Sequence, residues 1–137
     1  MSVKPQKGNL FLGLDSSTQS LKAVAIDGRK RIVFEESVNF DSDLPVFKTR
    51  GGVHRHPDGL TVTSPPLLWV AALDLLLMRM KKRNFPFDSL AAVSGSGQQH
   101  GTVYLRAGAG RVLGALCSCR TLEAQLTGIF AVQDSPI

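Results

Sequence analysis

The first forty residues alternate between short apolar runs and polar turns, which is typical of an antiparallel meander. Apolar positions predict strands over 10–14, 21–26 and 31–40, and the first of these ends at Asp15. Asp27-Gly28, between the second and third runs, is a strong hairpin signal. We therefore expect three antiparallel strands in this part of the chain.

The next strong pattern is an almost continuous apolar stretch over 67–80, which predicts a buried helix from about 66 to 83, packed across the sheet. Ser64 precedes two prolines and is the expected N-cap. The basic residues over 79–83 suit the C-terminal end of a helix dipole. Met78 and Met80 are both expected in the core.

The rest of the chain has weaker signals. Glycines and prolines interrupt 41–66, so we predict a long surface loop there. A crossover strand is expected over 90–93, followed by a polar, glycine-bracketed segment over 94–101. A further strand over 102–105 and a helix over about 120–130 complete an α/β pattern.

Composition is that of one modest globular domain, with 137 residues, 43% hydrophobic, and a mean hydropathy of +0.05. The net charge of +5 fits an anionic ligand. Nucleic acid is not the expected partner, because the cations form local clusters without interleaved aromatic residues. No targeting segment is evident, and the longest apolar stretch is too short to cross a bilayer. We expect a cytoplasmic (cytosolic) protein without membrane contact, whose oligomeric state the sequence leaves open.

Two pairs of potential metal ligands give weak signals. Cys117 and Cys119 are separated by one serine, and we expect free thiols. His54 and His56 would share a face if their segment were a strand, so a metal pair is conceivable. An exposed polar loop is the favoured interpretation, because two histidines alone make a weak metal site.

The tip of the first hairpin carries the first candidate site, Asp15-Ser16-Ser17-Thr18-Gln19. Backbone N–H groups of a turn form an anion-binding concavity, and hydroxyls add hydrogen bonds to phosphate oxygens. The carboxylate fits if a hard cation such as Mg²⁺ lies between it and the phosphate. The same residues are also common in ordinary polar turns.

The second candidate site follows the crossover strand and comprises Gln98, Gln99, His100 and Gly101. Ligands of open α/β sheets bind beyond the carboxyl ends of strands. Two amides and an imidazole supply the donors and acceptors that a sugar's hydroxyls need. A solvated glycine-rich linker explains the same residues.

A resemblance favours the binding interpretation at both places. The motif over 15–19, preceded by Leu12-Gly13 and followed by Lys22, resembles the first phosphate-binding motif of the FGGY carbohydrate kinases. The segments over 43–65 and 95–101 resemble the xylulose kinase branch of that family. The resemblance is specific over about 10–106 and weak from 107 to 137.

The resemblance implies the first part of the N-terminal lobe of the actin, hexokinase and sugar-kinase (ribonuclease H-like) ATPase fold. Residues 1–9 are then a disordered N-terminus, and 10–137 are a partial, truncated kinase domain. It also implies ATP and Mg²⁺ as cofactors and phosphorylation of D-xylulose to D-xylulose 5-phosphate. Asp15 would hold the metal through water, with Ser16, Ser17, Thr18, Gln19 and Lys22 on the ATP phosphates. Gln98, Gln99, His100 and Gly101 would contact the sugar.

In the resembling family the catalytic general base is an aspartate, which is expected beyond Ile137. The chain by itself is therefore expected to be inactive. Two alternatives remain open. One is a related kinase acting on glycerol or another sugar, and the other is a non-catalytic interaction module from a truncated product.

Overall fold

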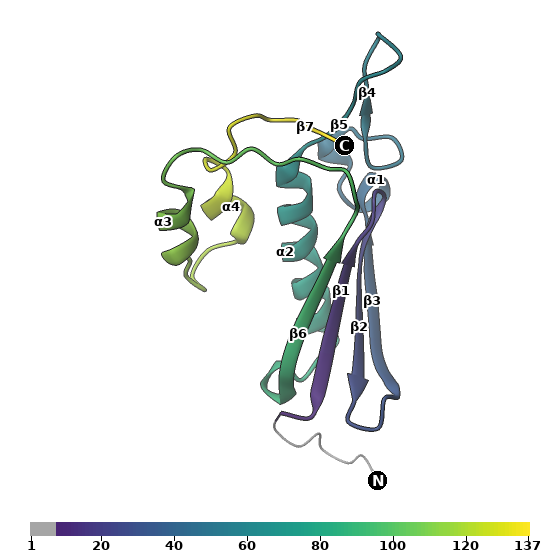
Figure 1. The fold of residues 1–137 in the computed structure, drawn as a ribbon. Helices are drawn as coiled ribbons and strands as arrows, with labels where there is room; N and C mark the ends of the chain where they lie inside the picture. The colour runs from purple at the N-terminus through teal and green to yellow at the C-terminus, as the bar shows by residue number, and fades with distance from the viewer. Residues whose placement is uncertain (1–7) are drawn as a thin grey trace.

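A four-stranded mixed sheet forms the centre of the computed structural model, which describes residues 8–137 (Figure 1). The strands are β1 (Leu10–Ser16), β2 (Ser20–Asp27), β3 (Ile32–Asn39) and β6 (Leu90–Gly97), in the order β3-β2-β1-β6. The first three are antiparallel, and β6 runs parallel to β1. The predicted meander is confirmed. We predicted that residues 1–9 are disordered, and residues 1–7 of that range lie outside the described residues.

The helix α2 (Pro66–Lys82) lies along one face of this sheet, as predicted. Its buried positions recur every fourth residue, because that spacing keeps side chains on one side of a helix. They pack against alternate residues of the strands, which point to the same face. The buried side chains are Leu68, Ala72, Leu76 and Met80 on α2, and Leu10, Leu12, Leu21, Ala23 and Ala25 on the strands.

Two details of the helix prediction are wrong. The N-cap is Pro65, and the Ser64 hydroxyl instead donates to the Gly52 carbonyl oxygen at 3.0 Å. Met78 is 60% exposed, whereas Met80 is completely buried. Residues 78 and 80 are two positions apart and cannot share a face of an α-helix, which explains the difference.

The basic end of α2 does more than complement the helix dipole. Arg79 forms an ion pair with Asp43 at 2.9 Å, and Arg83 forms one with Glu36 at 2.9 Å. Each guanidinium also donates to a backbone carbonyl of β3 at 2.7 Å. The pKa of Asp43 lies below its usual range, because the Arg79 side chain donates to its carboxylate. These contacts fasten the end of the helix to the third strand.

The segment over 41–66 is not the plain surface loop that we predicted. It contains the helix α1 (Phe40–Asp43), the 3-10 turn η1 (Pro45–Phe47), and the short strands β4 (His54–Arg55) and β5 (Val62–Ser64). Together with β7 (Ser135–Pro136), these strands form a second sheet in the order β4-β5-β7. The elements escaped prediction because tertiary hydrogen bonds stabilise them, and periodicity does not reveal such bonds.

Predictions for the C-terminal third were partly wrong. The strand β6 continues through Gly97, so residues 94–97 are paired with β1 and do not form a loop. The predicted strand over 102–105 is absent from the described residues, apart from one isolated bridge between Leu105 and Phe130. The predicted helix over 120–130 is only α4 (Leu122–Leu126).

Further structure in this region was not predicted at all. The 3-10 turn η2 (Phe87–Ser89) and the helix α3 (Ala109–Gly114) are both short, and each lacks a strong apolar period. Asp74 of α2 accepts hydrogen bonds from the N–H groups of Leu122 and Glu123, at 2.9 and 2.8 Å. This contact fixes α4 against α2 and explains the acidic residue within an apolar helix.

Cys117 and Cys119 form a disulfide, which corrects the expectation of free thiols. Their Cα atoms are 5.4 Å apart, a separation that a disulfide spans readily even with one intervening residue. Among the described helices, the structure has none with the length and apolar character that a bilayer crossing needs.

The two methionines of α2 provide a test of the core. Replacing Met80 with alanine leaves a cavity beneath the sheet and should lower the free energy of unfolding by about 2–5 kcal/mol. The matched change Met78→Ala should cost less than about 0.5 kcal/mol, since that side chain is exposed. Urea unfolding of both variants measures the difference. Equal losses would contradict the packing described here.

The Arg79–Asp43 ion pair should make stability depend on pH. Because the pKa of Asp43 is lowered in the folded state, its contribution is present above the unfolded pKa and is lost as the pH falls through the folded value. Asp43→Asn should therefore cost about 1 kcal/mol at pH 7 and less at about pH 2, where the carboxylate becomes protonated. Urea midpoints at the two pH values check this, and a cost independent of pH would contradict it.

Candidate functional site

The tip of the β1–β2 hairpin is a tight turn over 17–20. The N–H of Ser17 donates to the Ser20 carbonyl at 2.9 Å, and the Ser17 hydroxyl donates to the same oxygen at 3.1 Å. Within residues 8–137, no hydrogen bond uses the N–H of Thr18 or Gln19. The turn therefore offers two adjacent backbone donors to an anion.

Asp15 lies at the end of β1, on the sheet face opposite α2. The strand register places Lys22 of β2 on one side of it and Ser96 of β6 on the other. The Ser96 hydroxyl donates to Asp15 Oδ1 at 2.7 Å. Asp15 is exposed, so its second oxygen remains open to a ligand or to water.

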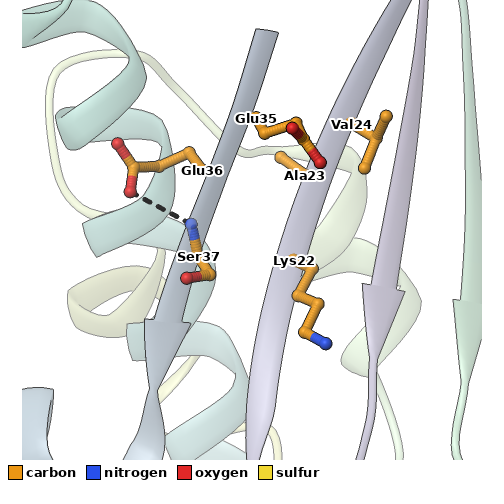
Figure 2. Close-up of a pocket in the computed structure, with 6 residues that line it drawn as sticks. All are labelled: Lys22, Ala23, Val24, Glu35, Glu36 and Ser37. Carbon is orange, nitrogen blue, oxygen red and sulfur yellow. Dashed lines mark hydrogen bonds between the residues drawn. The ribbon is translucent and has the colours of Figure 1, made fainter. Parts of the chain in front are cut away.

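Lys22 borders an open hollow of about 430 Å³ on β2 and β3 (Figure 2). In that view Val24 and Glu35 lie together, the Lys22 ammonium group is directed away from them, and Glu36 lies on the far side of β3. Glu36 instead pairs with Arg83 of α2. The Lys22 ammonium group and the Asp15 carboxylate thus belong to the same open face, beside the turn.

Pairing between β1 and β6 brings the second candidate segment to the same end of the sheet. The N–H of Gln98 donates to the Ser16 carbonyl at 2.9 Å, so the segment over 98–101 begins directly beside the phosphate motif. Gln99 and His100 are exposed. His100 has a φ of +69°, a left-handed conformation that non-glycine residues adopt at a cost.

Gln98 differs from its neighbours because its side-chain oxygen is buried. That atom has no hydrogen-bond partner among the described residues. Gly101 lies close to both Gln98 and Ile137, and the N–H of Thr102 donates to the Pro136 carbonyl at 3.1 Å. The segment therefore contacts the C-terminal residues at β7, while Gln99 and His100 are exposed.

The idea of a metal-binding histidine pair is not supported by the contacts that the two side chains make. His54 Nδ1 lies 3.0 Å from Asp134 Oδ1, and its Nε2 lies 2.8 Å from the Phe47 carbonyl oxygen. His56 Nε2 contacts the Thr63 hydroxyl at 3.0 Å. No cluster of three or more histidine, cysteine or acidic side chains suited to a metal occurs within residues 8–137.

A single carboxylate beside a phosphate turn still suits Mg²⁺, because this ion keeps several waters and binds through one or two carboxylates plus substrate phosphates. Asp15 is the carboxylate that lies beside this turn. The expected chemistry of the tip is therefore binding of a metal–phosphate group, with the donors of the turn on the phosphate and the carboxylate on the hydrated ion.

Sequence reasoning missed a segment that supports the turn from behind. Asp41 of α1 accepts hydrogen bonds from the Thr49 hydroxyl and the N–H groups of Gly51 and Gly52. Partial burial acts to raise the pKa of Asp41, but these hydrogen bonds outweigh it, and the pKa lies below its usual value. An acidic residue just after a strand and a later Gly-Gly pair were the only sequence signals.

Known proteins resemble this chain closely. It is 52% identical over 126 residues to a xylulose kinase of Rattus norvegicus, covering 92% of this chain and 24% of the relative. It is 50% identical over 138 residues to xylulose kinase 2 of Arabidopsis thaliana, covering 100% of this chain and 24% of the relative. The chain is a homologue of the xylulose kinases. It spans about a quarter of the length of these curated relatives.

Solved structures agree with the fold described here. One is the crystal structure of a xyloylose kinase from Brucella ovis, with a TM-score of 0.56 and 26% sequence identity. The match covers 72% of the present chain and 18% of the Brucella chain. A gluconate kinase from Lactobacillus acidophilus matches 72% of the chain and 17% of its own, at a TM-score of 0.55 and 19% identity, and supports the fold alone. No protein-family model matches the chain. The α/β fold is that of the sugar kinases, which are actin- and hexokinase-like, as the resemblance implied.

Proposed function

We propose that a protein containing this chain transfers the terminal phosphoryl group of ATP to D-xylulose, giving D-xylulose 5-phosphate. The observation that carries this proposal is the hydrogen bond from Gln98 to Ser16, which brings the amide- and imidazole-bearing segment beside a phosphate-type turn. The 52% identity to a rat xylulose kinase supports the choice of sugar. Phosphoryl transfer depends mainly on positioning and charge stabilisation, and adjoining sites for the two substrates provide the positioning.

On this proposal the hairpin tip holds the nucleotide phosphates. The free N–H groups of Thr18 and Gln19 donate to phosphate oxygens, and the hydroxyls of Ser16 and Thr18 add neutral donors. The Ser17 hydroxyl instead stabilises the turn, because it donates to the Ser20 carbonyl oxygen. Lys22 supplies a positive charge on the same face. Bound Mg²⁺ would neutralise phosphate charge, and Asp15 would hold the hydrated ion, with its carboxylate oriented by the Ser96 hydroxyl.

The sugar would lie above the segment over 98–101. Gln99 and His100 are exposed and can donate to and accept from hydroxyl groups, whereas the side-chain oxygen of Gln98 is buried and not open to a ligand. Gly101 lets the backbone come close to a ligand. The general base is not among these residues and is expected in the part of the protein beyond Ile137.

The cytosolic location of the protein also stays a prediction.

A direct test compares two proteins, the whole translation product that contains this chain and residues 1–137 alone. The first should form D-xylulose 5-phosphate from ATP and D-xylulose, and should turn over glycerol and gluconate far more slowly. The second should form none above background. A preference for glycerol or another sugar would favour the related-kinase alternative. Nucleotide-independent binding of a protein partner, without any kinase activity, would favour the interaction module.

Asp15→Asn tests the metal–phosphate assignment. The substitution keeps the side-chain shape and removes the charge, so turnover by the whole protein should fall by roughly two to three orders of magnitude with an unchanged melting temperature. Asp88→Asn, at an exposed aspartate of η2, is the matched control and should leave turnover unchanged. Near-normal turnover of the Asp15 variant at saturating Mg²⁺ would reject the assignment.

His100→Ala tests the sugar assignment. Loss of an imidazole partner for a hydroxyl group should weaken xylulose binding about tenfold or more and leave ATP affinity almost unchanged. The control is His56→Ala, which removes a histidine that contacts Thr63 in the second sheet. Isothermal titration with each substrate measures both affinities. If the His100 variant lost both ligands equally, the cause would be misfolding and not sugar contact.

A further inference from the structure

The phosphate turn is exposed at the hairpin tip and has few contacts of its own, but the segment over 40–52 packs against its carbonyl side. The N–H of Phe40 donates to the Gln19 carbonyl at 2.9 Å. Phe40 is completely buried, which anchors this contact in the core. One end of the segment is therefore fixed to the turn by a hydrogen bond.

The other end of the segment meets the turn at Gly52. A Cβ atom placed on Gly52 would lie 1.8 Å from the Thr18 carbonyl oxygen, a separation that no real contact allows. Gly52 also has a φ of +78° and follows Gly51 at +63°, two left-handed positions in succession. Backbone thus lies directly against backbone, and any shift of Gly52 must move the Thr18 carbonyl or open a gap.

Asp41 determines where Gly52 lies. Its Oδ1 accepts from the Gly52 N–H at 3.0 Å and from the Thr49 hydroxyl at 2.7 Å, and its Oδ2 accepts from the Gly51 N–H at 2.6 Å. Hydrogen bonds to an ionised carboxylate are shorter and stronger than neutral ones. One side chain therefore holds both left-handed glycines behind the turn.

The orientation of the turn follows from these contacts. The carbonyls of Thr18 and Gln19 face Gly52 and the Phe40 N–H, and a peptide unit directs its N–H and C=O to opposite sides. Fixing the Thr18 carbonyl on one side consequently directs the Gln19 N–H, which belongs to the same peptide unit, toward the open side. That side is where the proposed phosphate would bind.

We propose that Asp41 is a positioning residue for nucleotide binding, which holds Gly52 against the Thr18 carbonyl and thereby presents the N–H of Gln19 to phosphate. This role rests on the proposed function, because it deepens the account of the same phosphate site. Asp41 does not touch the nucleotide. It acts through Gly51 and Gly52.

The test is Asp41→Asn in the whole translation product, with Mg·ADP as the probe in isothermal titration calorimetry. The amide has one acceptor oxygen in place of two, so Gly52 or Gly51 loses its partner and the turn loosens. We expect Mg·ADP to bind about five- to tenfold more weakly, with KM for ATP raised in proportion and KM for xylulose unchanged. Thr49→Val, which removes a single donor, should weaken Mg·ADP binding two- to threefold and serves if Asp41→Asn does not fold.

Asp43→Asn is the matched control, because it changes the same residue type on the same short helix but breaks the ion pair with Arg79. It should lower the melting temperature without weakening Mg·ADP. If Asp41→Asn, or Thr49→Val in its place, binds Mg·ADP as tightly as the unmodified protein, the positioning role is wrong. The positioning role is also wrong if Asp43→Asn weakens Mg·ADP binding as much as Asp41→Asn does, because the effect is then one of general stability. An unmodified protein that binds no nucleotide would overturn the proposed function itself, and the role of Asp41 with it.

Discussion

Close packing of α2 on the small side chains of β2 is the contact on which the rest of the structure depends. Ala23 and Ala25 are almost completely buried beneath the helix, and their size lets larger side chains such as Leu76 and Met80 fill the space between the layers. The helix also bridges the outer elements, since Arg79 and Arg83 bind α1 and β3 while Asp74 caps α4. The sheet is thus held rigid from one side, which leaves its opposite face and its upper end available for ligands.

The end of the sheet at which β1 and β6 finish is a candidate site because of the order of the strands (Figure 1). In the sheet, β1 lies between β2 and β6, so the hairpin turn that follows β1 and the segment that follows β6 emerge side by side. A hydrogen bond between Gln98 and Ser16 continues the pairing into these loops. Residues that are some eighty positions apart in sequence thereby meet, and two modest polar motifs become one combined surface.

Elements with strong local signals could be predicted from the sequence, and those that depend on distant partners could not. The meander and α2 follow from apolar periods that survive in any context. The second sheet could not be found, because β5 is only three residues long and its pairing with β7 joins Ser64 to Ser135. Asp41 was missed for the same reason, since its three donors lie eight to eleven residues away in an irregular loop. Met78 was misplaced because an apolar residue type says nothing about which face of the helix it occupies.

The central claim is that the turn over 17–20 binds nucleotide phosphate through the N–H groups of Thr18 and Gln19. The most direct measurement is a titration of ¹⁵N-labelled whole protein with Mg·ADP, following the backbone amide signals. The account predicts large, saturable shifts at Thr18 and Gln19, with smaller ones at Gly51 and Gly52 behind them. Saturable Mg·ADP binding that leaves the signals of Thr18 and Gln19 unmoved would contradict it.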